Sequence, residues 1–285
     1  MMELLSWLLE PLGYGFMWRG LLASVLVGVI CSVLGSYIIL QGMAFFGDAL
    51  SHAILPGVVL AYLAGWPLAA GALAFGILSA IGIGALSHRG EIREDTAIGI
   101  IFAGSFALGV AMLSTVRNYA VDLAHILFGN VLGVSVQDLW LTFGLGALVL
   151  LVVFVFYKEF LVLAFDPTLA VVLRLPVTAL RYLLLVLIAV TIVISLQTVG
   201  VALMIAMLVT PAAAAQLLTR RLPSMMATAA LIGALSNVTG LYLSYYANIA
   251  SGPAMVLVAT AIFGVVFLLA PRRGMVWRRL AAQPA

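Results

Sequence analysis

The chain has 285 residues, of which 65% are hydrophobic and 8% are charged, and its mean hydropathy is +1.27. A soluble chain of this length cannot bury so much apolar surface, so the composition excludes a soluble protein and indicates one whose solvent is lipid. The net charge of +3 is spread over separate loops rather than gathered in one patch, which argues against nucleic acid as a partner.

Nine apolar segments are predicted to cross the bilayer as helices, because each is close to the roughly 20 residues that a span requires. An eight-span arrangement is the alternative, since the segments 47–64 and 67–86 are tightly joined at Trp66-Pro67. The predicted fold class is an all-α polytopic membrane protein, with one transmembrane domain over residues 1–285. The nine segments run approximately over 19–41, 46–65, 67–87, 96–116, 136–156, 180–196, 199–218, 225–246 and 253–271.

The basic residues predict the orientation of the chain. Eleven of its thirteen lysines and arginines fall in four clusters, and the positive-inside rule assigns such clusters to the cytoplasm. With nine spans, the C-terminus is then cytoplasmic and the N-terminus external. The clusters are Arg89 and Arg93; Lys158, Arg174 and Arg181; Arg220 and Arg221; and Arg272, Arg273, Arg278 and Arg279.

Asp48 and His52 are the only acidic or histidine side chains between Gly20 and Ser87. In a helix, residues four apart share a face, so a carboxylate and an imidazole are predicted to point the same way. Ionisable groups at membrane depth are costly and usually face a pore, a partner or a bound ion. The pair therefore predicts a path for a divalent metal ion. The alternative is an intrahelical ion pair that only neutralises itself.

The longest predicted cytoplasmic stretch is Tyr157–Arg181. Asp166 suits a helix N-cap, Pro167 suits the first helical position, and Pro176 ends the run. We expect a short, mostly apolar helix over Leu169–Leu175. It is either a docking element for another protein or a helix that packs under the bundle.

Residues Arg117–Gly133 are too polar to span the bilayer, and we expect an external loop with a short helix around Ala124–Leu132. Its Asp122 and His125 suggest either a metal relay at the outer mouth or an ordinary solvated loop, and the second reading is favoured. Asn237, within a later span, either lines a path or bonds between helices.

The sequence lacks the common motifs of covalent catalysis and nucleotide binding. Its single lysine, Lys158, follows no glycine-rich loop, no histidine opens an HExxH pattern, and no Gly-x-Ser-x-Gly motif occurs. The chain is therefore expected to transport or hold a ligand rather than to be an enzyme. If ATP drives it, another subunit must carry the ATPase.

Five blocks in order resemble the zinc/manganese/iron ABC-importer permeases. The first, QGMAFFGDALSHA at residues 41–53, contains Asp48 and His52 and closely resembles the signature of that family. The others are EDTAIGI at 94–100, LFGN at 127–130, FDP at 165–167, and QTVG at 197–200 followed by PAAAA at 211–215. The resemblance extends from residue 41 to about 255, which covers the whole expected fold.

The resemblance implies a type II ABC-importer permease bundle in the bacterial cytoplasmic membrane, working by alternating access. It implies a homodimer around one path, two cytoplasmic ATP-binding subunits that hold the ATP, and an extracytoplasmic metal solute-binding protein. Asp48 and His52 fall on the family's metal-coordinating pair, for transported Mn²⁺, Zn²⁺ or Fe²⁺ and without any permanently bound cofactor. The family's coupling helix falls on about Asp166–Leu175, within 157–181.

Several residues of that segment are expected to contact the ATPase, although a cap or a solvated face explains some of them equally well: Glu159, Asp166, Pro167, Leu169 and Leu173. Two rival functions remain open at this point. One is an ATP-independent secondary carrier or channel for metal, and the other is an ABC permease for a metal chelate. A small acidic and imidazole pair fits a naked ion better than a bulky chelate.

Overall fold

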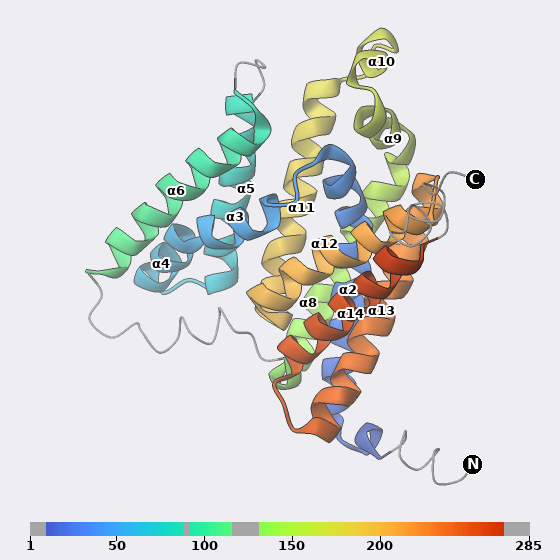
Figure 1. Ribbon diagram of the computed structural model, residues 1–285. Coiled ribbons are helices and arrows are strands. Elements are labelled where there is room, and N and C mark those ends of the chain that lie inside the picture. The colour runs from blue at the N-terminus through green and yellow to red at the C-terminus, as the bar shows by residue number, and fades with distance from the viewer. Residues whose placement is uncertain (1–9, 88–91, 116–130, 271–285) are drawn as a thin grey trace, which may run out of the picture. The chain divides into compact units, whose positions relative to one another are not determined.

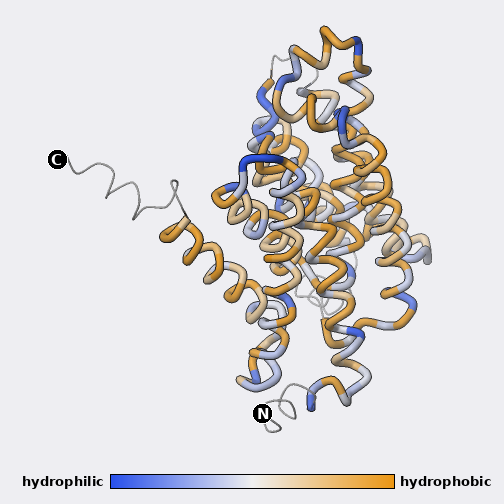
Figure 2. Tube along the Cα trace, turned by 90° about the vertical axis from the view of Figure 1, so that its right-hand side faces the viewer, coloured by the Kyte–Doolittle hydropathy of each residue, from blue (hydrophilic) through white to orange (hydrophobic). Residues whose placement is uncertain are grey.

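The computed structural model describes residues 10–87, 92–115 and 131–270, and the regular elements within these ranges are all helices. Nine of the described helical segments are long and apolar enough to cross a membrane, as the sequence predicts. Figure 1 shows these helices in chain order, and Figure 2 shows apolar residues along most of their length. Helices that are apolar along most of their length suit a protein whose outer helices meet lipid.

The described helices begin and end close to the predicted bounds. The spanning segments are α2 (Gly15–Gln41), α3 with α4 (Phe46–Ala53 and Leu55–Ala64), α5 (Leu68–Ser87), α6 (Glu94–Leu113), α8 (Val136–Val155), α11 (Val177–Val199), α12 (Val201–Leu218), α13 (Leu222–Ala247) and α14 (Ser251–Leu269). Shorter helices are η1 (Pro11–Gly13), η2 (Val131–Gly133), α9 (Tyr157–Phe165) and α10 (Pro167–Val172).

The second predicted span is a broken helix rather than one continuous rod. The break lies at Ile54, between α3 and α4. Pro56 explains it, because proline has no N–H to donate to the carbonyl four residues earlier, and its ring crowds that carbonyl. Gly65, with φ 67°, then ends α4 in the left-handed conformation that glycine adopts without strain. The segments on either side of Trp66-Pro67 are thus separate helices.

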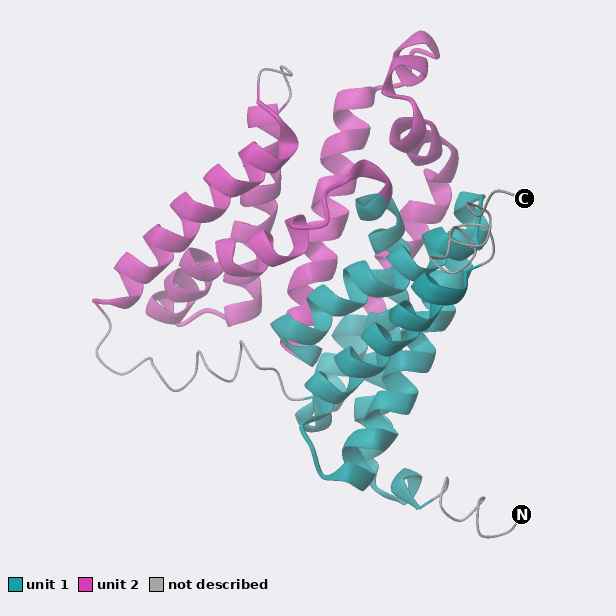
Figure 3. Ribbon diagram, viewed as in Figure 1, with its two compact units in different colours: residues 1–39, 128–143, 198–285 teal, residues 40–127, 144–197 magenta. Residues whose placement is uncertain are grey.

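The chain divides into two compact units, coloured separately in Figure 3. Unit 1 comprises residues 1–39, 128–143 and 198–285. Within it α12, α13 and α14 pack on one another. Glycine allows close approach here: a Cβ on Gly35 of α2 would collide with the Leu208 carbonyl of α12. Such backbone-to-backbone packing replaces the hydrophobic drive that is absent in lipid.

Unit 2 comprises residues 40–127 and 144–197, and it contains both candidate sites. In this unit α3, α4 and α5 pack on α6, and α9 packs on α10. Gly57 of α4 and Gly71 of α5 meet backbone to backbone, and Gly84 of α5 lies against Tyr182 of α11. These contacts hold α3, the short helix that carries Asp48 and His52, within a frame of longer helices.

Candidate metal site and coupling segment

Asp48 and His52 lie on the same face of α3, as their spacing predicts. Asp48 is in the first turn of the helix and His52 in the last. His52 Nε2 lies 3.7 Å from Asp48 Oδ1. Two ligands about 2.1 Å from one metal ion lie roughly 3.4 Å apart at a tetrahedral angle, so this separation suits a shared cation.

Both side chains of the pair are half-buried in the single chain. The Asp48 side chain is 35% exposed and that of His52 is 30% exposed, whereas neighbouring Leu50 is fully buried. The face of α3 that is most deeply buried is therefore the apolar one, and the face that bears the carboxylate and the imidazole is the more exposed one. Ionisable groups so placed on a membrane helix need a pore or a partner in front of them.

Two phenylalanines of α6 lie against the imidazole of His52. The Phe106 ring meets the imidazole edge to face, with ring centroids 5.7 Å apart. The centroid of the Phe102 ring lies 6.0 Å from that of the imidazole. The two phenylalanine rings stack on each other at 5.9 Å, and Phe45 adds an edge-to-face contact with Phe102. Aromatic pairs in these geometries restrain each other's orientation. His52 is thus held by its neighbours as well as by its own helix.

One chain supplies an incomplete ligand set. Among the residues that the structure describes, no group of three or more His, Cys, Asp and Glu side chains is placed to hold a metal ion. A pair offers two donors, whereas first-row divalent ions in proteins take four to six. A metal ion bound by this pair would need further donors from water, from the backbone or from another chain.

The predicted coupling segment forms two short helices, α9 and α10. Asp166 caps α10 as predicted: its Oδ1 accepts hydrogen bonds from the backbone N–H groups of Thr168 at 2.9 Å and Leu169 at 3.0 Å. Pro167 occupies the first turn. The helix ends at Val172, before Pro176 is reached, because Arg174 adopts a left-handed conformation with φ 55°. The element is therefore shorter than the predicted Leu169–Leu175.

The surface of α10 is apolar and unusually exposed. Only Ala170 is buried in this helix, whereas Leu169, Val171, Val172 and Leu173 are all exposed, Val172 at 71%. Exposed aliphatic side chains in a row are typical of a contact surface. Glu159 on α9 behaves differently, because its Oε2 atom is buried and has no hydrogen-bond partner among the described residues. The coupling candidates therefore divide into an exposed apolar group on α10 and a half-buried acid on α9.

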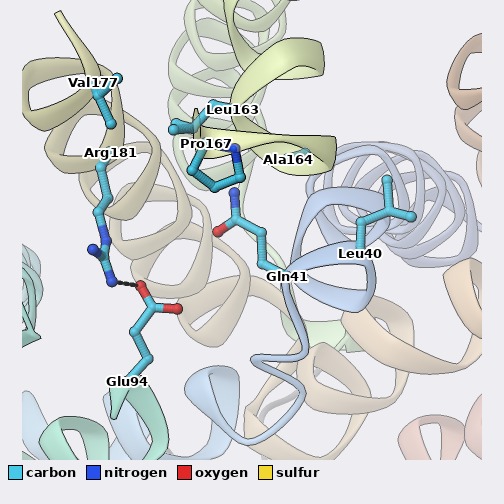
Figure 4. Close-up of a pocket in the computed structure, with 8 residues that line it drawn as sticks. All are labelled: Leu40, Gln41, Glu94, Leu163, Ala164, Pro167, Val177 and Arg181. Carbon is cyan, nitrogen blue, oxygen red and sulfur yellow. Dashed lines mark hydrogen bonds and ion pairs between the residues drawn. The ribbon is translucent and has the colours of Figure 1, made fainter. Parts of the chain in front are cut away.

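A cavity of about 340 Å³ lies within unit 2, beside this segment. Arg181 forms an ion pair with Glu94 at its wall, and Figure 4 shows the Gln41 amide extending toward Pro167. Arg181 Nη2 also donates a hydrogen bond to Ser87 Oγ at 3.2 Å. The cavity is lined by Leu40, Gln41, Glu94, Leu163, Ala164, Pro167, Val177 and Arg181.

Asn237 bonds between helices, which was the second of its two predicted roles. Its Nδ2 donates to the Ser24 carbonyl of α2 at 2.5 Å, and the side chain is fully buried. Neighbouring Ser236 donates to the Ile232 carbonyl of its own helix. Asp122 and His125, the other polar candidates, lie outside the described residues. So does most of the short external helix expected around Ala124–Leu132.

Three functional candidates were missed by sequence reasoning: Phe102, Phe106 and the Glu94–Arg181 pair. No local pattern distinguishes the two phenylalanines from other apolar residues of a span. The pair left a partial signal, since Glu94 and Arg181 are opposite charges at the ends of predicted membrane helices. Only the packing of unit 2 shows that those ends meet.

Comparison with known proteins gives one consistent relationship. The family model described as the ABC 3 transport family matches residues 13–270. The manganese transport system membrane protein MntC of Listeria innocua is 49% identical over 266 residues, covering 93% of this chain and 95% of that protein. MntC of Halalkalibacterium halodurans is 46% identical over 269 residues, which cover 94% of this chain and 92% of that protein.

A solved structure supports the same relationship at the level of the fold. PsaBC from Streptococcus pneumoniae, solved in complex with Fab, is similar with a TM-score of 0.84 and 38% sequence identity. The match covers 96% of this chain and 98% of that one. The all-α arrangement predicted from the sequence, with nine candidate spanning helices among the described residues, therefore has the same fold as that solved structure.

Proposed function

Because the chain belongs to the ABC 3 transport family, we propose that it is the membrane-spanning permease of an ATP-driven importer of divalent metal ions. The chain is the transport subunit, and separate cytoplasmic ATP-binding subunits bind and hydrolyse the ATP. The relatives named above for manganese make Mn²⁺ the first substrate to test. Zn²⁺ and Fe²⁺ are the competitors, since nitrogen and oxygen ligands suit all three ions.

The Asp48–His52 pair carries the proposal. A carboxylate oxygen and an imidazole nitrogen 3.7 Å apart, on the more exposed face of a membrane helix, are matched to a divalent ion in transit. Two donors bind weakly, which suits a site that must release its ion. A second copy of the chain, related by a two-fold axis, contributes another Asp48 and His52, so that a homodimer holds two oxygen and two nitrogen ligands.

The exposed apolar surface of α10 is the proposed contact with the ATP-binding subunit. Leu169 and Leu173 supply hydrophobic contacts, and Asp166 and Pro167 fix the start of the helix. Glu159, on α9, is a positioning group behind that surface. Movement of α9 and α10 on ATP binding and hydrolysis then opens the path to one side of the membrane and closes it on the other.

The chain is proposed to lie in the bacterial cytoplasmic membrane as one permease domain, with its C-terminus in the cytoplasm. The clustering of basic residues supports this orientation. In this orientation α10 lies on the cytoplasmic side of the membrane, where ATP is available. The extracytoplasmic solute-binding protein then delivers the metal from the opposite side. No resident cofactor is needed, since the metal ion is cargo.

The test is ATP-dependent uptake of radioactive manganese into proteoliposomes that contain the permease, its ATP-binding subunits and the solute-binding protein. Asp48→Ala and His52→Ala are expected to abolish uptake while pull-down of the ATP-binding subunit stays unchanged. Ser51→Ala is the matched control, because Ser51 lies between them but bonds only to the backbone of Asp48 among the described residues. Normal uptake by both variants would contradict the proposal that Asp48 and His52 bind the transported metal. Uptake without ATP would favour an ATP-independent secondary carrier.

A further inference from the structure

The Glu94–Arg181 ion pair joins three helices of unit 2 at one end. Ser87 ends α5, Glu94 begins α6, and Arg181 lies one turn inside α11. The Glu94 side chain is 24% exposed and that of Arg181 is 30% exposed, so neither charge is fully hydrated. Charges in such surroundings are strongly dependent on their partner, because removal of one leaves the other desolvated and unpaired.

α6 is less buried than α5 and α11, the two helices to which this pair joins it. Only 17% of the residues in its most apolar stretch are buried. The same helix carries Phe102 and Phe106, roughly two and three turns beyond Glu94 at 3.6 residues per turn, and both rings contact His52. A shift of the Glu94 end of α6 therefore reaches the imidazole through a stiff helix and two aromatic contacts.

The other side of the pair faces the coupling segment. The cavity beside Glu94 and Arg181 is walled by Leu163 and Ala164 of α9 and by Pro167 of α10. Its volume, about 340 Å³, corresponds to roughly ten water molecules at about 30 Å³ each. Close-packed interiors resist displacement, whereas a cavity of this size lets α9 and α10 move without overpacking the region.

We propose that Glu94 and Arg181 are positioning residues for transport, and that their ion pair carries the movement of α9 and α10 to α6 and from there to His52. The inference rests on the proposed function, since it takes α10 as the contact with the ATPase and His52 as a metal ligand. Energetic coupling between separate sites can be carried by a chain of packed side chains, ion pairs and rigid helices. α10 ends at Val172 and α11, which carries Arg181, begins at Val177, so the route from α10 through α11, the Arg181–Glu94 pair and Phe106 to His52 is such a chain.

The test measures the number of Mn²⁺ ions imported per ATP hydrolysed, in the reconstituted complex. Glu94→Gln and Arg181→Gln are each expected to lower this ratio about tenfold, within the range found for contacting residues in double-mutant cycles. The double variant should lose no more than either single variant, because the two side chains act through one shared contact that each single change already breaks. Asp95→Asn is the control: it makes the same chemical change one residue later, at an exposed position, and should keep the wild-type ratio.

A purely structural role has a different signature. It lowers the amount of assembled complex, measured by pull-down of the ATP-binding subunit, but leaves the ions imported per ATP unchanged. An unchanged ratio in both single variants, or additive losses in the double variant, would overturn the inference. If the wild-type complex itself imports no Mn²⁺ with ATP, the proposed function fails instead, so the two failures are distinguishable.

Discussion

The imidazole of His52 meets the ring of Phe106 edge to face, with ring centroids 5.7 Å apart and planes inclined at 74°. The contact joins α3 to α6, two helices that are separated by the forty residues 54–93 of the chain. If His52 binds a passing ion, as proposed, its imidazole loses less rotational entropy when its orientation is already fixed. Phe106 therefore belongs to the candidate site although it supplies no ligand atom.

Replacing Phe106 with alanine is expected to weaken metal capture without abolishing transport. Edge-to-face contacts of this kind contribute about 0.5–1.5 kcal/mol, which corresponds to a rise of roughly two- to tenfold in the KM for Mn²⁺. Phe106→Tyr keeps the ring and should stay near the wild-type value. The dependence of the initial uptake rate on Mn²⁺ concentration measures the effect.

A matched control for Phe106 is Phe154→Ala. Phe154 is also exposed, at 80%, but it lies on α8 and contributes nothing to the aromatic cluster around His52. An equal rise in KM for this control would show that loss of any exposed ring is harmful. That result would contradict the inference that Phe106 acts by orienting the imidazole of His52.

The cap of α10 gives a second prediction. Asp166→Ala removes the acceptor of two backbone hydrogen bonds, and loss of an N-cap costs about 1 kcal/mol. A helix of six residues is not stable by itself, so α10 should fray and retain less of the ATP-binding subunit in a pull-down. Asp166→Asn keeps the acceptor and should bind nearly as the wild type does. Equal loss in both variants would assign the effect to charge rather than to the cap.

The features that the sequence predicts well are local or compositional. Helical spans follow from the run of apolar residues, and the shared face of Asp48 and His52 follows from the helical repeat. The cap at Asp166 is equally local. The break at Ile54 was missed even though Pro56 is visible in the sequence, because a proline inside an apolar run is often tolerated within a membrane helix.

Contacts between distant segments were not predictable by the same means. Phe102 lies fifty residues from His52 and has no distinguishing local pattern, so its role follows only from the packing of α6 on α3. Glu94 and Arg181 were visible as charges at helix ends, yet opposite charges at many helix ends never meet. Close approach of α5 and α11 at Gly84 and Tyr182 is what brings this pair within reach.

A third prediction concerns the frame that supports α3. Gly57 of α4 and Gly71 of α5 are in backbone contact, and a Cβ at either position would collide with the carbonyl of the other. Because a backbone atom cannot swing aside as a side chain does, Gly57→Ala should lower the free energy of unfolding by about 1–3 kcal/mol. Thermal unfolding of the purified permease in detergent measures this change.

Gly104→Ala provides the comparison for that experiment. Gly104 lies on α6 with open space around its Cα, so an added methyl group meets nothing and improves helix propensity by up to about 1 kcal/mol. Its unfolding temperature should equal or exceed that of the wild type. A similar loss of stability in both variants would contradict the assignment of the Gly57–Gly71 contact as a special close approach.

The fourth prediction separates stability from transport at Asn237. Asn237→Ala removes the hydrogen bond from α13 to the Ser24 carbonyl of α2. Interhelical hydrogen bonds in membranes contribute about 0.6 kcal/mol on average and up to about 1.7, so the unfolding temperature should fall while uptake per assembled complex stays unchanged. Thr239→Ala, which loses a bond within its own helix, should change neither quantity. Reduced uptake with unaltered stability would instead make Asn237 a residue that lines the path, because an amide that contacts the passing ion acts on transport and not on the folded state.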